Sequence, residues 1–92
     1  MTITVQIDVS EGEQHRQLCI TVADAALADV RYRFNPSGLV TVDELKLLAA
    51  AFITKAMEMG ERNPGAEREA SVARTWAQGA SMWAVAGATK GL

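Results

Sequence analysis

Thr41-Val42-Asp43-Glu44 opens the stretch that decides the fold of this chain. It matches a capping box, in which a threonine side chain accepts from the third helical amide and the glutamate reaches back to the threonine amide. Gly60 suits the left-handed residue that follows many helices, so the pattern predicts a helix over about 42–59. Apolar residues recur there at alternating spacings of three and four, as on one helix face: Val42, Leu45, Ala49, Phe52, Ala56 and Met59.

A second helix is expected after a short connector, 61–65, in which Asn63 can cap and Pro64 can take the first helical position. It runs to about Thr89, and the two helices form an antiparallel hairpin over 41–90. Its expected seam alternates small and large residues: Ala73, Trp76, Ala80, Trp83 and Gly87. Most of its remaining circumference is apolar or small, which favours burial between subunits of a homo-oligomer; the alternative is that the N-terminal sheet folds over this face.

Residues 1–35 are expected to form β-strands. Strict alternation over 3–9 and again over 18–22, with turn residues between, predicts an antiparallel hairpin. A third alternation over 30–35, ended by Pro36, completes a small meander, and 24–29 is either a linker or a short helical turn. The predicted fold class is therefore α+β: a small N-terminal antiparallel β-sheet followed by an antiparallel two-helix hairpin, in a single domain over 1–92.

Charge and composition exclude several classes of protein. The chain has 92 residues, a net charge of −2 at pH 7 and a pI near 5.3, so it lacks the positive field that duplex nucleic acid or an anionic membrane surface requires. Any anion it binds should sit in a focused pocket. No apolar run is long enough for a bilayer span, and a single cysteine cannot form an intramolecular disulfide, so a cytosolic protein is expected.

Residues suited to catalysis are few. The chain has one histidine and one cysteine, no metal-ligand spacing and no glycine-rich phosphate loop, so no catalytic residue, metal or cofactor is expected. His15 is expected to be solvated, and Cys19 to be a small buried apolar residue.

The segment 31–38, Arg-Tyr-Arg-Phe-Asn-Pro-Ser-Gly, places two guanidiniums and two aromatic rings just before a helix N-terminus. Those groups suit a nucleotide, because an aromatic face stacks a base, guanidiniums bind phosphate oxygens, and amides at a helix start favour anions. The alternative is that Tyr32 and Phe34 face the core and that the arginines are solvated.

Three further stretches resemble a known family: FNPSG (34–38), VDELKLLAAAFI (42–53) and REASVARTWAQGASMWAVAGATK (68–90). In this order they resemble the helical-hairpin domain of the phage Thoeris anti-defence and anti-CBASS proteins, which sequester cyclic nucleotide signals. The strand-rich N-terminus is closer to the Thoeris branch. The resemblance implies a non-enzymatic protein, usually hexameric, that binds a nucleotide signal between subunits in the infected host's cytoplasm. Family ligands are cyclic ADP-ribose isomers with a glycosidic linkage between riboses, cyclic dinucleotides and, in a separate pocket, cyclic trinucleotides.

The resemblance also implies which residues bind the nucleotide. Phe34 would stack on a base, Lys46 and Arg68 would bind phosphates, and Asn35 and Thr75 would hydrogen-bond a ribose or base edge. For the two cations a plainer alternative exists: Lys46 is solvated, and Arg68 pairs with a nearby glutamate.

Two departures from the family pattern bear on the ligand. Gln78 replaces an acidic residue and Gly87 a basic one, which speaks against trinucleotide binding. Two competing functions remain open. One is an oligomeric structural or assembly protein of a phage or mobile element that binds no small molecule. The other is an enzyme that cleaves the same signals, for which no base, nucleophile or metal site is evident.

Overall fold

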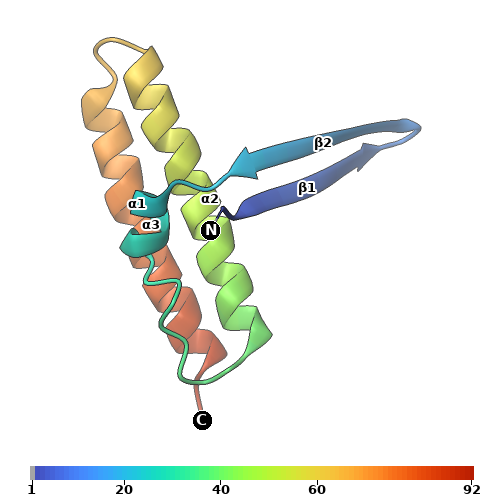
Figure 1. Cartoon of the computed structure of the whole chain (residues 1–92), viewed down its shortest axis with the longest axis vertical. Helices are drawn as coiled ribbons and strands as arrows, with labels where there is room; N and C mark the ends of the chain where they lie inside the picture. Colours follow the sequence, from blue (N-terminus) through green and yellow to red (C-terminus); the bar gives the residue numbers. More distant parts are fainter. Residues whose placement is uncertain (1) are drawn as a thin grey trace.

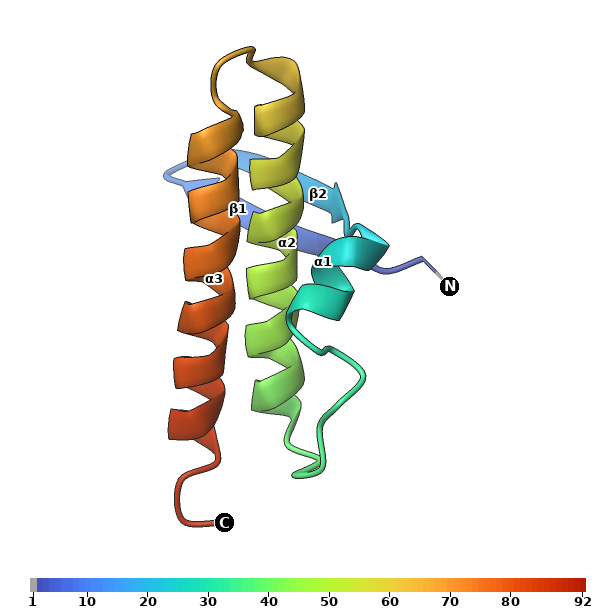
Figure 2. The ribbon, with the colours of Figure 1, turned by 90° about the vertical axis from the view of Figure 1, so that its left-hand side faces the viewer.

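The computed structural model describes residues 2–92. Two helices lie side by side as an antiparallel hairpin, a short helix packs on one of them, and two strands form an arm that projects from the side of the hairpin (Figures 1 and 2). The predicted α+β fold, a small antiparallel sheet followed by a helical hairpin, is confirmed. The elements in chain order are β1 (Thr4–Glu11), β2 (Gln14–Thr21), α1 (Asp24–Asp29), α2 (Val40–Arg62) and α3 (Glu67–Ala88).

The β arm, formed by β1 and β2, is a two-stranded antiparallel ribbon whose register runs from Thr4 opposite Thr21 to Glu11 opposite Gln14. Gly12 turns the chain at its tip with φ of 60°, a value that glycine adopts without steric cost. One face carries the apolar pairs and the other the polar pairs, as the alternation predicts. Only the base of the arm reaches the core, through Ile3, Val5 and Ile20.

The predicted third strand over 30–35 is wrong, because β1 and β2 are the only strands in the part of the chain that the structure describes. The preceding segment forms α1, which confirms the helical-turn alternative. Ala26, Leu27 and Val30 then share one helical face and are buried against α2. Arg31 leaves α1 with φ of 52°, which turns the backbone away from any strand path.

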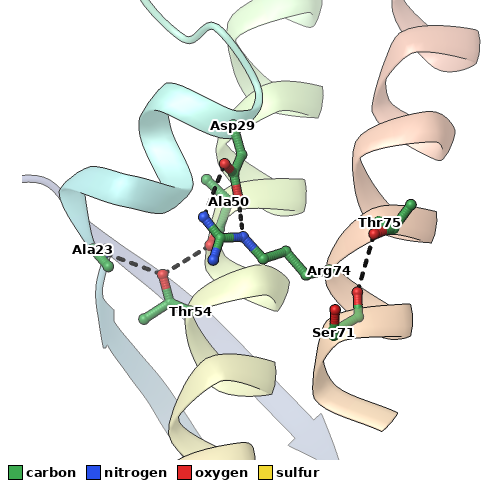
Figure 3. A network of polar contacts seen from close by, with 7 residues as sticks. All are labelled: Ala23, Asp29, Ala50, Thr54, Ser71, Arg74 and Thr75. Carbon is green, nitrogen blue, oxygen red and sulfur yellow. Dashed lines mark hydrogen bonds and ion pairs between the residues drawn. The ribbon is translucent and has the colours of Figure 1, made fainter. Parts of the chain in front are cut away.

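The core lies where α1, α2 and the base of the β arm meet, with Ile53 and Ala50 of α2 at its centre. Thr54 ties these elements together, as Figure 3 shows. Its Oγ1 accepts from the Ala23 N–H at 3.1 Å, and its hydroxyl donates to the Ala50 carbonyl at 2.9 Å. The buried Thr54 hydroxyl thus gives a hydrogen-bond partner to the backbone amide at the junction between the β arm and α1.

The ends of α2 differ from the prediction. The expected capping box does not form: α2 begins at Val40, Leu39 is its N-cap without a side-chain cap, and Thr41 and Glu44 are exposed. At the other end α2 continues through Gly60 to Arg62. Gly60 serves close packing instead, since a Cβ built there would lie 2.6 Å from the Ala70 Cβ.

The start of α3 and its packing face also differ. Its N-cap is Ala66, not Asn63, and Pro64 stays in the connector. The expected seam is wrong, because Trp76 and Trp83 are 76% and 81% exposed. Small residues such as Ala77 and Ser81 face the core and α2 instead, since they let the two backbones approach closely.

The β arm does not fold over this exposed face of α3, so that alternative is wrong as well (Figure 1). No helix in the described range 2–92 is long and apolar enough to cross a bilayer.

Candidate functional site

Lys46 organises the loop between α1 and α2. It is only 6% exposed, which rules out a solvated surface lysine. Its Nζ donates to the Arg31 carbonyl at 2.8 Å and also to the Phe34 carbonyl. The same ammonium lies 5.9 Å from the centroid of the Phe34 ring, within reach of a cation–π interaction. One side chain of α2 therefore holds both ends of the 31–34 turn.

Asn35 closes the second half of the loop. Its Nδ2 donates to the Leu39 carbonyl at 2.9 Å and to Asp43 Oδ1 at 3.1 Å. Its Oδ1 accepts from the Ser37 hydroxyl at 2.6 Å, and the Ser37 Oγ accepts from the Leu39 N–H at 3.2 Å. Ser37 thus accepts from the N-cap amide of α2, the contact that the glutamate of the expected capping box would have made, and Asn35 holds the Ser37 hydroxyl in place.

The loop presents an aromatic and cationic surface. Phe34 is 64% exposed, as expected for a ring that stacks on a base, whereas Tyr32 packs against the core, as the alternative interpretation expected. The Arg33 guanidinium lies 5.5 Å from the Tyr32 ring centroid. An open hollow of about 620 Å³, here called the loop hollow, is lined by Asp24, Leu27, Ala28, Arg31, Tyr32, Arg33 and Phe34.

A second hollow, here called the Lys46 hollow, lies between α3 and the loop after α1 and measures about 610 Å³. Arg31 and Lys46 line it on one side, and Gln78 and Ser81 of α3 on the other. Met82 and Val85 supply an apolar wall. Both hollows fall within the size range of small-molecule sites.

Asp29 also lines the Lys46 hollow, but its carboxylate is engaged. Both of its oxygens accept from Arg74 of α3, as Figure 3 shows. This hydrogen bond and the charge of Asp29 raise the pKa of Arg74 above its usual value. The carboxylate is therefore neutralised within the chain and does not cancel the neighbouring cations.

The structure brings together Phe34, Asn35 and Lys46 but not the other two expected site residues. Arg68 lies in the first turn of α3, exposed, beside a small hollow with Glu69, Val72 and Ala73. Since Gly60 meets Ala70, Arg68 sits near the end of α2, roughly 20 Å along the helix axis from Lys46.

Thr75 is exposed on α3, and its hydroxyl donates to the Ser71 carbonyl at 3.1 Å (Figure 3). Arg68 makes no ion pair within the described residues 2–92, so the alternative of a glutamate partner is not seen there.

Ser81 is a lining residue that the sequence did not predict, and Arg31 was predicted only as one of two guanidiniums in a nucleotide-binding segment. Arg31 stands in the segment 31–38, and the signal that could have singled it out is its place directly after a short helix. Ser81 gives no signal in the sequence, because a serine in an alanine-rich helix is common on any face.

The remaining chemistry-bearing residues lie on the β arm. His15 Nδ1 is 3.0 Å from the Ser10 Oγ on the exposed face, and Cys19 is exposed there, contrary to the prediction that it is buried. No cluster of three or more histidine, cysteine, aspartate or glutamate side chains forms a metal site in the described part of the chain.

An apolar groove, here called the hairpin groove, runs between α2 and α3 and measures about 540 Å³. Its lining is almost entirely hydrocarbon, and Leu48, Phe52 and Trp76 in it are all more than half exposed. Contiguous apolar surface of this kind is unusual on a monomer and typical of an interaction face.

The fold and the two hollows define a class: a small helical-hairpin protein with a cationic and aromatic surface beside the loop that precedes α2. The family model of the Acb2/Tad1 hairpin domain matches residues 24–89, and the chain belongs to this family of phage proteins that sequester cyclic nucleotide signals. The match begins at the first residue of α1 and covers α2 and α3, so the β arm lies outside it. A search of curated proteins and a search of solved structures each gave no significant match.

Proposed function

We propose that this protein binds a cyclic nucleotide immune signal and withholds it from the host's defence effector without cleaving it. The ligand is a glycocyclic ADP-ribose isomer or a cyclic dinucleotide, and the site of action is the cytoplasm of the infected cell. The observation that carries the proposal is the loop held by Lys46, which presents Phe34 beside the guanidiniums of Arg31 and Arg33. Membership of the Acb2/Tad1 family supports the same class of ligand.

A preset loop suits tight binding of a cyclic ligand. Its backbone carbonyls and its asparagine amide are already satisfied within the chain, so little ordering free energy is spent when the ligand arrives. A cyclised nucleotide has likewise lost much of its conformational freedom before binding. Both partners therefore meet in nearly their bound shapes.

Each expected site residue has a proposed role. Phe34 stacks on a base, since its ring is exposed beside the cations. Lys46 has given two of its three donors to carbonyls, which leaves one for a phosphate oxygen. The Asn35 side chain is already hydrogen-bonded within the loop. It therefore either accepts a hydrogen bond from the ribose or base with the remaining lone pair of its Oδ1, or acts indirectly by holding the loop in its binding shape.

Arg68 lies too far from the loop to complete the same pocket in one chain, and Thr75 is exposed on α3 and lines neither hollow. They contribute to the ligand from a neighbouring subunit or form a separate site on α3. The absence of an acidic group at Gln78 and of a basic group at Gly87 makes a cyclic trinucleotide the less favoured ligand there.

We further propose that the active form is a homo-oligomer, with a hexamer as the family's usual state. The hairpin groove and the exposed Trp76, Met82 and Trp83 on α3 support it, because burying them between copies removes large apolar side chains from water. A small core of this kind gains stability by assembly.

Native mass spectrometry tests the proposal directly. The purified protein is mixed with an equimolar panel of cyclic ADP-ribose isomers, cyclic dinucleotides and cyclic trinucleotides, and one spectrum gives subunit count, ligand mass and stoichiometry. We expect a saturated oligomer carrying one panel member, which denaturation releases with its mass unchanged. Recovery of an altered ligand would favour an enzyme, and an oligomer that binds none of the panel would favour an assembly role.

A further inference from the structure

Lys46 is a buried cation that lacks an anionic partner in its own chain. Among residues 2–92 the ion pairs are Lys55–Glu58 and Arg74–Asp29, so no carboxylate there pairs with the Lys46 ammonium. Its two partners are neutral backbone carbonyls. Buried charges in proteins are normally paired, because removal from water without a counter-charge is costly. The ammonium is therefore poised for an anion that the chain itself does not supply.

The surroundings of Lys46 hold further groups that bind anions. Arg31 lines the same hollow, and its side chain is free of ion pairs within residues 2–92. Across the hollow stands Ser81, which is 6% exposed, so that its hydroxyl is a donor already largely removed from bulk water. Gln78 adds an amide. The one carboxylate on the wall, Asp29, is neutralised by Arg74.

We propose that the Lys46 hollow is a phosphate site completed within one subunit, in which Arg31, Lys46 and Ser81 bind the oxygens of a phosphate or pyrophosphate group. This inference rests on the proposed function for the rest of the ligand, a cyclic nucleotide whose phosphates enter this hollow. It adds Ser81 as a binding residue, assigns the Arg31 guanidinium to this hollow, and places the phosphates on the α3 side of the loop. The Arg31 fork takes two phosphate oxygens, and the ammonium and the hydroxyl take the remaining ones.

The backbone of Arg31 provides a way to test the side chain separately from the fold. Its φ of 52° lies in the left-handed region, which a glycine adopts without strain. Arg31→Gly therefore removes the guanidinium while it relieves the backbone. If the Arg31 side chain has only a structural role, this variant should bind the anion as the wild type does. If it binds phosphate, the variant should be more stable than the wild type and bind the anion more weakly.

The experiment measures the melting temperature of the full chain with increasing sodium pyrophosphate, against sodium chloride at matched ionic strength. We expect pyrophosphate to stabilise the wild type. Arg31→Gly should melt at a higher temperature without ligand and bind pyrophosphate about 10- to 100-fold more weakly, as expected for the loss of charge-assisted hydrogen bonds. Ser81→Ala should weaken binding less, by about 3- to 10-fold, for the loss of one hydroxyl donor.

Arg62→Gln is the matched control, because Arg62 is an exposed cation at the end of α2 that lines neither the loop hollow nor the Lys46 hollow. It should keep pyrophosphate binding close to the wild-type value. Equal loss in the Arg31 and Arg62 variants would overturn the proposal in favour of a diffuse positive surface. A wild type that pyrophosphate does not stabilise would overturn it as well, for example where a neighbouring subunit's carboxylate occupies the hollow. Pyrophosphate binding without binding of any cyclic nucleotide would uphold the phosphate site and refute the proposed function.

Discussion

Arg74 of α3 holds Asp29, the last residue of α1, through two parallel hydrogen bonds. Its Nε donates to one carboxylate oxygen at 2.5 Å and its Nη2 to the other at 3.0 Å, across 45 residues of sequence (Figure 3). A carboxylate at the C-terminal end of a helix is unfavourable unless it is paired, because the helix end carries partial negative charge. The pair therefore both neutralises Asp29 and fastens α1 to the hairpin beside the Lys46 hollow.

Removing this pair should loosen α1 without unfolding the hairpin. Arg74→Ala is expected to lower the free energy of unfolding by about 1 kcal/mol, a modest value because the arginine side chain is 36% exposed and solvent screens the charge. Arg74→Lys keeps the charge but not the pair of parallel hydrogen bonds, so its free energy of unfolding should lie between those of the wild type and Arg74→Ala. Urea denaturation followed by circular dichroism measures the difference.

The pH dependence of this pair follows from the raised pKa of Arg74, which the hydrogen bond and charge of Asp29 cause. A base whose pKa is higher in the folded state stabilises the fold at every pH below its pKa in the unfolded state, and it loses that contribution only as the pH rises through its pKa in the folded state. The difference between wild type and Arg74→Ala should thus stay constant between pH 6 and pH 10. A difference that shrinks within this range would contradict the assignment.

Close packing of α2 on α3 at Gly60 gives a second prediction. Gly60→Ala would place a methyl group 2.6 Å from the Ala70 Cβ, so the helices must separate there, and we expect a loss of about 1–3 kcal/mol in unfolding free energy. The double variant Gly60→Ala with Ala70→Gly moves the methyl group to the other helix and should recover much of the loss. Gly79→Ala, where nothing lies within 4 Å of the added Cβ, should be neutral or stabilising. Thermal denaturation of the wild type, Gly60→Ala, Ala70→Gly and the double variant forms a complete cycle, with Gly79→Ala as the control.

The two long helices were predictable because their apolar period extends over many residues. Their ends were not: the pattern at Thr41 and Glu44 fits a capping box, but the side chain that accepts from the N-cap amide of α2 is Ser37, which lies before the helix. The choice of packing face also depended on information that the sequence lacks. Both tryptophans fit a seam by spacing, yet alanines pack more closely, and which stripe faces the partner helix is decided by the two backbones together.

The candidate site was only partly predictable for a similar reason. Phe34, Asn35 and Lys46 are within thirteen residues of one another, and the family resemblance singles them out. Ser81 reaches the Lys46 hollow only because α3 runs antiparallel to α2, and no local pattern encodes that contact. The alternation over 30–35 was misleading because α1 buries Val30 and turns the chain at Arg31, so tertiary packing overrides the local preference for a strand.

Phe34 and Asn35 should separate a binding role from a structural one. Phe34→Ala removes a ring that is 64% exposed, so stability should hardly change while affinity for the cyclic nucleotide falls about 10- to 100-fold with the lost stacking. Asn35→Ala breaks the side-chain bonds to Leu39, Asp43 and Ser37, so stability should fall by about 1–2 kcal/mol together with affinity. Calorimetric titration gives the ligand affinity and melting curves give the stability of each variant, so the two measurements on the same samples distinguish a binding role from a structural one. An Asn35→Ala protein of unchanged stability would show that the loop does not depend on this side chain.

Assembly through the hairpin groove is tested at Trp76, whose side chain is 76% exposed in the single chain and lines the groove beside Phe52. Trp76→Glu should leave the helical content intact, since the ring contributes little to the fold of one chain. It should convert the oligomer to a smaller species at micromolar concentration, because a charge buried in an apolar interface has no partner.

Thr41→Glu is the matched control, since it adds the same charge at an exposed α2 position outside the groove. Sedimentation velocity reads the mass of each variant, and a Trp76→Glu protein that assembles like the wild type would remove the groove as the interface. If the variant is a folded monomer that still binds pyrophosphate, the phosphate site is complete in one subunit and the oligomer serves the rest of the ligand.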